Sequence, residues 1–309
     1  MIKFEFIDPT AQNYHLLLKR CPKSTLLQSY PYAYAIRQTQ KLQTRLAILK
    51  KGQQEIGFFN IHEAKTLFGL LHVITIDRGP CWFESQDTKE NMQDFAAALH
   101  QYAPKRFGRM RRFMPETTLS INLANWKYRS KVPHYKTIWL DLTQTITALR
   151  NQLNRKWRNH LNQAEKKNLT VDDTITEETI PWFLQGYLKD RMEKHYAGAG
   201  LRFSAHLFTK AHEQGDLVLL KALQKNKPIA AIALIKHGQC ATYQIGWTTT
   251  AGRATNAHHF LLWQAIQRLK NQGICYLDLG GINPETAIGV TQFKRNMGAD
   301  ETTLIGQFG

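Results

Sequence analysis

The residues best suited to chemistry lie together near the C-terminus. Asp278 lies near the end of a short apolar strand expected at residues 274–279, and two glycines, Gly280 and Gly281, directly follow that strand. Adjacent glycines let the backbone adopt positive φ and approach a ligand closely. Asp278 adds a hydrogen-bond acceptor at this opening, and Lys294, on the short helix expected next, adds a cation. The same pattern is also typical of an ordinary strand, a tight turn and a solvated basic helix.

This stretch carries a resemblance to a known family. A strand ending in D-x-GG, a loop, G-x3-FK and a closing glycine resemble the C-terminal signature of the FemABX aminoacyltransferases. Members of that family transfer an amino acid from aminoacyl-tRNA to the peptide of a peptidoglycan precursor. The matching residues are Asp278, Gly280, Gly281, Gly289, Phe293, Lys294 and Gly298. The resemblance implies an enzyme whose catalytic residues are Lys294, Phe293 and Asp278, with the two central glycines next to the substrate.

Acyl transfer from an activated ester requires an amine aligned with a carbonyl and stabilisation of the developing oxyanion. We expect Lys294 to supply a cation near the ester or its leaving 3′-oxygen. Phe293 either positions the acceptor or supports its helix. Asp278 either holds the loop or accepts a hydrogen bond from the acceptor amine. Tyr243 and Trp247, at the end of a predicted central strand, either stack on a base or sugar or pack in the core.

Composition bounds the class of protein and its partners. The chain has 309 residues, and 41 Lys and Arg against 24 Asp and Glu give a net charge of +17. Such a surplus favours an anionic partner, for example nucleic acid, a nucleotide sugar, a phospholipid surface or CoA. Four widely separated cysteines without metal-type spacing predict reduced thiols in a cytoplasmic protein. No signal-peptide pattern or membrane-spanning run is visible, so we expect no stable membrane insertion and leave transient membrane-surface contact open.

An internal similarity indicates how the chain is organised. A hairpin predicted at residues 46–61 is repeated at residues 217–235, and each copy is followed by a third strand and a helix. Two copies of one plan indicate a duplication. The tandem GNAT-like (acyl-CoA N-acyltransferase-like) fold of FemABX proteins is such a duplication. The resemblance therefore implies an α+β protein with two GNAT-like domains, residues 1–133 and 134–309, each a mixed sheet flanked by helices.

Arginines are the candidates for binding the acceptor. The family has a substrate-binding lysine at the far end of an early helix, whose start matches here at Gln28. The expected position falls on Ile36, and the nearest cation is Arg37. Family members also carry a substrate-binding arginine near a later helix break, where Arg191 and Arg202 both qualify. The sequence leaves these choices open.

A basic helix is predicted at residues 145–168. Its apolar residues recur every four positions and form one buried stripe: Leu149, Leu153, Trp157 and Leu161. The remaining face is rich in Lys and Arg and resembles the helix that opens the second domain of the family. Arg155, Lys156 and Arg158 are therefore candidates for tRNA binding, with an ordinary solvated basic face as the alternative.

Other site classes lack their motifs. The chain has no Walker-type loop, no G-x-G-x-x-G and no G-x-S-x-G, and the adjacent His258 and His259 do not share a helix face as a metal pair would. We expect no metal and no cofactor, with aminoacyl-tRNA as co-substrate. A second hypothesis is a CoA-dependent N-acyltransferase, although residues 251–254 lack the glycine-rich pyrophosphate pattern. A third is an RNA-binding protein with a vestigial cleft. The expected acceptor is a peptide or nucleotide-sugar peptide, and the expected state is a monomer.

Overall fold

A computed structural model of the chain describes residues 1–196 and 198–309. The chain divides into two compact units. Unit 1 consists of Met1–Lys136, His237–Gln239 and Thr302–Gly309, and unit 2 consists of Thr137–Lys236 and Cys240–Glu301. The sequence places residues 302–309 in the second domain, whereas the structure places them in unit 1. The reason is that Phe308 forms β-bridges with Phe113 and Tyr128 and packs into the core of unit 1.

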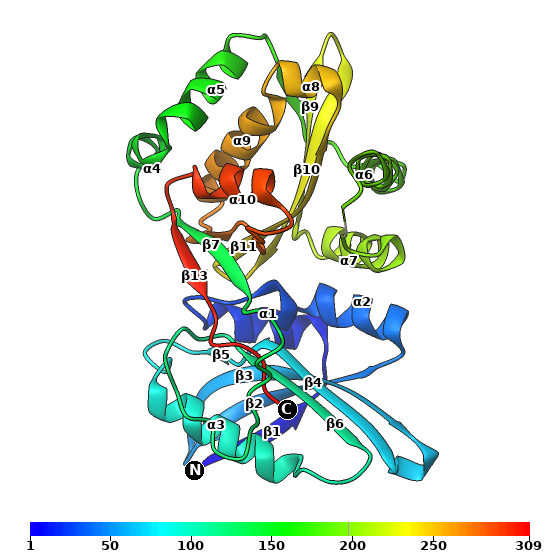
Figure 1. The fold of residues 1–309 in the computed structure, drawn as a ribbon, viewed down its shortest axis with the longest axis vertical. Helices are drawn as coiled ribbons and strands as arrows, with labels where there is room; N and C mark the ends of the chain where they lie inside the picture. The colour runs from blue at the N-terminus through cyan, green and yellow to red at the C-terminus, as the bar shows by residue number, and fades with distance from the viewer. Residues whose placement is uncertain (197) are drawn as a thin grey trace. The chain divides into compact units, whose positions relative to one another are not determined.

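Unit 1 contains a mixed sheet with helices on both faces (Figure 1). Its strands are ordered β1-β2-β3-β4-β6, with β5 paired to β3, and only β4 and β6 among the neighbouring pairs run parallel. Its elements are β1 (Ile2–Ile7), α1 (Ala11–Lys19), a 3-10 turn (Leu26–Gln28), α2 (Tyr30–Gln40), β2 (Gln43–Lys51), β3 (Gln54–Thr66), a second 3-10 turn (Leu67–Gly69), β4 (Leu71–Gly79), β5 (Cys81–Trp82), α3 (Lys89–Tyr102) and β6 (Arg109–Pro115).

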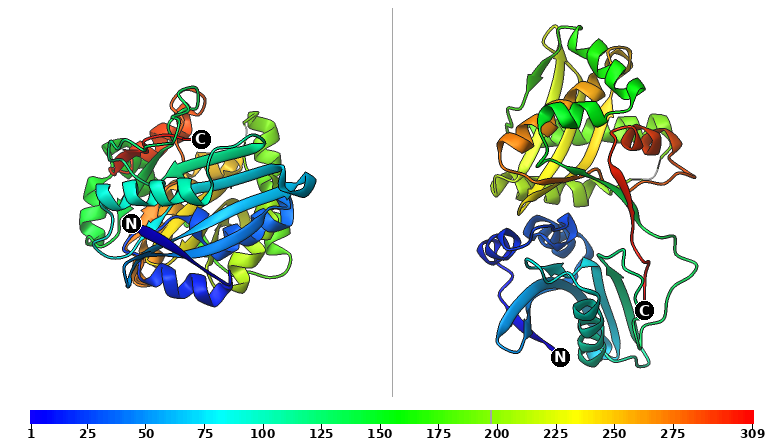
Figure 2. Two further views of the ribbon diagram at one scale, coloured as in Figure 1. Left: turned by 90° about the horizontal axis from the view of Figure 1, so that it is seen from below. Right: turned by 90° about the vertical axis from the view of Figure 1, so that its left-hand side faces the viewer.

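Consecutive apolar residues give the sheet of unit 1 two buried faces. Ala47 and Phe59 point to the α3 side and share a core with Phe95, whereas Leu46 and Phe58 join the opposite cluster with α1 and α2. Successive side chains of a strand point to opposite faces, so a continuous apolar run indicates a strand covered on both sides. Figure 2 shows the helices of unit 1 on the two sides of its sheet.

Unit 2 contains a second mixed sheet, ordered β13-β7-β12-β11-β10-β9-β8. Helix α9 packs on one face with α5 beside it, and α6 and α7 pack on the other (Figure 1). Its elements are β7 (Lys136–Asp141), α4 (Ile146–Gln152), α5 (Arg155–Glu165), β8 (Thr170–Asp172), α6 (Thr179–Lys194), α7 (Leu201–Glu213), β9 (Leu217–Gln224), β10 (Lys227–His237), β11 (Cys240–Thr248), α8 (Thr250–Ala254), α9 (Ala257–Asn271), β12 (Tyr276–Asp278), α10 (Ile288–Arg295) and β13 (Asp300–Thr303).

The two units repeat one supersecondary plan. An antiparallel hairpin, β2–β3 or β9–β10, is followed by a third strand and by helix α3 or α9. A fourth strand then pairs in parallel with the third, as β6 does with β4 and β12 with β11. Both predicted hairpins are confirmed, and the parallel fourth strand extends the similarity between the copies.

The predicted basic helix is broken in two. Leu153, with φ −55° and ψ 132°, ends α4, and the Asn154 side chain accepts a hydrogen bond from Lys156 N–H to cap α5. An asparagine at an N-cap replaces a missing intrahelical partner, so a new helix begins there. The predicted apolar stripe is nevertheless buried on both sides of the break.

Within the part of the chain that the structure describes, no helix combines the length and apolar character needed to cross a bilayer.

Candidate active site

The site is built where β11 and β12 stop pairing. The parallel pair covers only three residues of β12 and ends at Thr242 and Asp278, although β11 continues to Thr248. Beyond Asp278 the chain turns at Gly280, which has a φ of +75°. A Cβ at Gly280 would lie 2.9 Å from the carbonyl oxygen of Tyr243. The turn therefore requires glycine for its φ and for its close approach to β11.

Asp278 holds this turn from inside the protein. Its buried carboxylate accepts hydrogen bonds from Gly280 N–H at 2.8 Å and from the hydroxyl of Thr137 on β7. These contacts describe the loop-holding role, one of the two roles expected for Asp278. Thr137 was not predicted as part of the site, and the only signal for it is the alternation of residues along β7.

Lys294 is directed at the same turn. It lies on α10 with only 6% of its surface exposed, and its Nζ donates to the carbonyl oxygens of Gly281 at 2.9 Å and Gly280 at 3.3 Å. Burial lowers the pKa of Lys294 to about 8, and the charge of Asp278 opposes this shift. The structure thus brings together the lysine, the aspartate and both glycines that the sequence singled out.

Phe293 anchors α10 to the rest of unit 2. Its ring centroid lies 4.9 Å from that of His259, 5.4 Å from that of His258 and 5.8 Å from that of Trp157. These rings come from α9 and α5, so Phe293 ties three helices together next to Lys294. Of the two expected roles, these contacts correspond to support of the helix.

Tyr243 and His258 form a polar pair beside the lysine. The Tyr243 hydroxyl and His258 Nε2 are 3.0 Å apart, and the Lys294 Nζ lies 5.8 Å from the centre of the Tyr243 ring. Burial lowers the pKa of His258 to about 4 and raises the pKa of Tyr243, so both groups are neutral at pH 7. His258 was not predicted as a site residue. Its neighbour His259 instead pairs with His160, with the ring nitrogens 3.3 Å apart.

A buried carboxylate on α6 belongs to the same electrostatic environment. Asp190 binds Lys194 Nζ at 2.6 Å and accepts a hydrogen bond from the Tyr196 hydroxyl at 3.2 Å. Its charge adds to the rise of the Tyr243 pKa, which burial mainly causes, and opposes the lowering of the His258 pKa. Sequence reasoning missed Asp190 because an acid four residues before a lysine on a helix is typical of a surface pair.

The remaining candidates have contacts of their own. Arg191 donates to the carbonyl of Ala199 at 3.2 Å, and Arg202 lies in the first turn of α7. Arg37 belongs to the last turn of α2 in unit 1, and its guanidinium lies over the rings of two tyrosines. Trp247 is buried against α6, where its indole N–H donates to the Phe183 carbonyl at 3.0 Å. The contacts of Trp247 correspond to the packing role.

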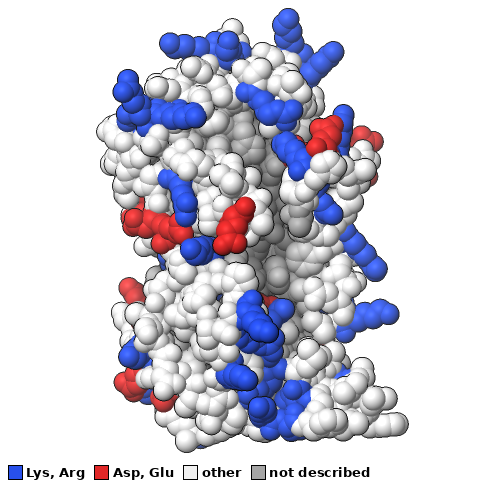
Figure 3. Space-filling model, viewed as in Figure 1, with Lys and Arg blue, Asp and Glu red and all other residues white. Residues whose placement is uncertain are grey.

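The start of α5 presents a basic hollow. A cavity of about 390 Å³ is lined by polar and basic side chains of this helix: Asn154, Arg155, Lys156, Asn159, His160 and Gln163. Arg155 and Lys156 are exposed, whereas the guanidinium of Arg158 folds back to the Asn151 carbonyl at 3.4 Å. Figure 3 shows Lys and Arg side chains on this part of unit 2.

Known proteins share this architecture. A model of the acetyltransferase (GNAT) domain matches residues 147–295. The crystal structure of FemX is similar over 98% of this chain and 96% of its own, with a TM-score of 0.80 and 15% identity. A conserved protein of unknown function from Bacteroides thetaiotaomicron has a TM-score of 0.62 and 12% identity over 100% of this chain and 98% of its own.

A tandem GNAT protein from the clavulanic acid biosynthesis pathway is also similar, with a TM-score of 0.51 and 11% identity over 100% of this chain and 98% of its own. No curated protein sequence matches the chain. The matched domain model supports an acyltransferase, and the predicted fold class is confirmed. The chain therefore has a FemX-like tandem GNAT fold, with two mixed sheets flanked by helices.

Proposed function

We propose that this protein transfers an amino acid from aminoacyl-tRNA to an amine of a peptide acceptor, with a peptidoglycan-precursor peptide as the acceptor class. One observation carries the proposal. Gly280 and Gly281 form what we call the twin-glycine turn. The Lys294 ammonium is buried against this turn, where it contacts Gly280 O and Gly281 O. A cation held in a fixed place with little water around it suits the stabilisation of a developing oxyanion.

The chemistry needs few groups because the ester is already activated. The neutral acceptor amine attacks the ester carbonyl carbon, and the carbonyl oxygen gains negative charge. The bond from that carbon to the ribose 3′-oxygen then breaks, and the 3′-oxygen leaves with the proton that the amine loses. An ammonium has three N–H groups. Two of those on Lys294 donate to the glycine carbonyls, so among the described contacts the third is available for the oxyanion or the leaving oxygen. The neutral Tyr243–His258 pair borders the lysine without adding a competing charge.

The segment after β11 supports tRNA over CoA as donor. A pyrophosphate would need free backbone N–H groups here. Gly252 N–H instead donates to Thr249 Oγ1 at 3.1 Å, and Arg253 N–H donates to Thr249 O at 2.9 Å. A Cβ at Gly252 would lie 2.3 Å from Ile229 O, so this turn is closed against β10.

We further propose that tRNA phosphates bind the exposed start of α5 at Arg155 and Lys156, with Arg158 beside them. A hollow lined by side chains of one basic helix suits phosphate groups. Arg37, Arg191 and Arg202 remain candidates for the acceptor. Charged tRNA is a cytoplasmic substrate, and the four free cysteines agree with a reducing compartment.

The donor can be identified in one comparison. The protein is incubated with a muropeptide and either tRNA charged with a labelled amino acid or labelled acetyl-CoA. We expect label to move from tRNA to the peptide, and none to move from acetyl-CoA. If the label stays on tRNA while acetylated peptide forms, the CoA hypothesis replaces ours. Binding of tRNA without either product would instead favour the RNA-binding hypothesis.

The pH dependence of transfer tests the charge state of Lys294. Because only the protonated amine is a cation, we expect kcat/KM to fall as pH rises through about 8, the pKa of Lys294. His258, with a pKa of about 4, is already neutral there and does not explain this limb. The limb should vanish from the residual activity of Lys294→Met. A wild-type rate that instead rises through pH 8 and stays high would argue against the cationic role.

A further inference from the structure

Two loops of unit 1 expose apolar side chains at one place. One is the tip of the β3–β4 hairpin and the other is the segment before β6. Of the thirteen exposed large apolar side chains among the described residues, six lie in these loops or at the start of the strand that follows each loop: Leu67, Phe68, Leu70, Leu71, Phe107 and Met110. Phe68 is exposed at 112% and Phe107 at 87%. We call these six residues the apolar tip. Such a concentration is typical of an interaction surface.

The apolar tip has a defined shape. Leu67 and Phe68 have φ values of +48° and +52°, which large side chains rarely adopt and which cost free energy. Arg106 ties the two loops together, since its guanidinium donates to Gly69 O at 2.6 Å and to Leu70 O at 3.0 Å. A Cβ at Gly108 would lie 2.3 Å from Leu70 O, so the loops touch.

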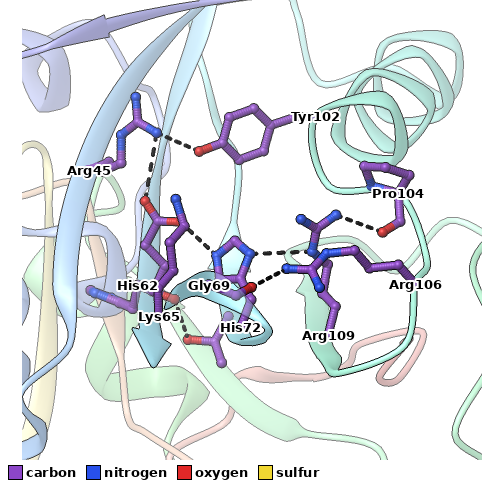
Figure 4. A network of polar contacts seen from close by, with 11 residues as sticks. Arg45, His62, Lys65, Gly69, His72, Tyr102, Pro104, Arg106 and Arg109 are labelled. Atoms are coloured by element: carbon purple, nitrogen blue, oxygen red, sulfur yellow. Dashed lines mark hydrogen bonds and ion pairs between the residues drawn. The ribbon is translucent and has the colours of Figure 1, made fainter. Parts of the chain in front are cut away.

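Cations stand behind the apolar tip. They come from β2, β3, the segment before β6 and the first residue of β6: Arg45, Lys65, Lys105, Arg106 and Arg109. The acid among them is the buried Glu63, which lies 3.6 Å from Arg45 Nη1 and 3.8 Å from Lys65 Nζ (Figure 4). These five cations against one carboxylate give 5 − 1 = +4. Figure 3 shows Lys and Arg side chains on this part of unit 1.

His72 does not change that balance. Its Nδ1 accepts from Arg109 Nε at 3.3 Å, so its Nε2 carries the proton and donates to Glu63 at 2.9 Å. Burial and the neighbouring cations lower the pKa of His72, and the carboxylate of Glu63 opposes them. The imidazole is neutral at pH 7, and the positive charge behind the apolar tip comes from lysines and arginines alone.

We propose that the apolar tip binds the surface of an anionic lipid membrane. Phenylalanine and leucine side chains enter the boundary between headgroups and acyl chains, to a depth of about 5–10 Å. Lys65 lies near the end of β3, two residues before Leu67, and is therefore close to the apolar tip along the chain. There its charge meets the lipid headgroups, and long cationic side chains favour that level.

An RNA ligand fits this surface less well. Phe68 and Phe107 offer rings on which bases can stack, but the other four side chains of the apolar tip offer none. The guanidinium of Arg106 already donates to three backbone carbonyls. Arg109 likewise donates to Pro104 O at 2.8 Å. Binding to a membrane requires only positive charge and apolar side chains that enter the lipid. Binding to RNA phosphates requires free N–H groups on the arginines. This proposal does not depend on the reaction in unit 2.

The test is flotation of the full-length protein with vesicles of phosphatidylcholine alone or with 30% phosphatidylglycerol. We expect binding to the anionic vesicles only, and its loss in 1 M NaCl. The double substitution Phe68→Ser and Phe107→Ser should weaken binding at least tenfold. Lys65→Gln with Lys105→Gln should weaken it about 25-fold, at roughly fivefold per lysine.

Matched controls distinguish binding through the apolar tip from nonspecific hydrophobic or electrostatic binding elsewhere on the protein. Leu16→Ser removes another exposed leucine from unit 1, and Lys225→Gln with Lys227→Gln removes two exposed lysines from unit 2. Neither should change binding. Hydrogen exchange of the wild type should slow in residues 65–71 and 105–110 when anionic vesicles are added. Absence of vesicle binding, equal binding to both vesicle types, equal losses in the controls, or protection elsewhere but not in these loops would overturn the proposal. So would loop variants that weaken tRNA binding and leave vesicle binding intact.

Discussion

Replacing Lys294 with methionine should lower kcat for aminoacyl transfer by about a thousandfold. Methionine keeps the length and apolar volume of the side chain but removes the charge that we place at the oxyanion. Loss of one preorganised oxyanion donor lowers kcat about 10²–10³-fold, and here a full charge in a buried position is lost as well. The tRNA affinity should hardly change, because the proposed phosphate contacts lie on α5. Single-turnover transfer from charged tRNA, with a filter-binding assay alongside, measures both quantities.

A matched lysine in unit 2 provides the control. Lys270 also donates to two backbone carbonyls, Leu142 O at 2.9 Å and Thr143 O at 3.4 Å. These carbonyls follow the C-terminal end of β7, whereas Thr137 lies at its N-terminal end. Lys270→Met therefore removes similar hydrogen bonds without touching the twin-glycine turn, and we expect nearly wild-type transfer. Full activity in Lys294→Met would show that another group stabilises the oxyanion. An equal loss in Lys270→Met would attribute the effect to folding.

Gly280→Ala should lower the transfer rate about a hundredfold. The alanine would have to adopt a φ of +75° and would place its Cβ 2.9 Å from Tyr243 O, so the turn must shift. The shift moves the carbonyl that orients Lys294, and a displacement of about 1 Å at a catalytic group can cost about 10²-fold. The left-handed conformation alone should lower the free energy of unfolding by about 1–2 kcal/mol.

Gly273 provides a control that separates the effect of backbone strain from the effect of displacing Lys294. It follows α9 with a φ of +77°, and a Cβ there would meet nothing within 4 Å. Gly273→Ala should therefore lose similar stability in a denaturant titration while transfer stays near the wild-type rate. If Gly280→Ala transfers amino acids as fast as Gly273→Ala does, the twin-glycine turn does not position the lysine.

Local patterns account for much of this protein. Short apolar runs predicted the hairpins β2–β3 and β9–β10, because a strand buried on both faces must be apolar along its length. The apolar spacing of four predicted the stripe from Leu149 to Leu161. Gly280, Gly281 and Lys294 could be placed together from the sequence, because Lys294 follows Gly281 by only 13 positions and the motif itself joins them.

Only the tertiary structure decided which distant residues complete the site. Thr137 reaches Asp278 because β7 pairs with β12, and His258 reaches Tyr243 because α9 packs on the sheet. The tail residue Phe308 joins unit 1 through two short β-bridges. None of these contacts has a local period or motif, since each depends on strand order and helix packing across more than ten residues of chain. The sequence by itself determined the turn and its lysine, and the packing of the sheet decided what surrounds them.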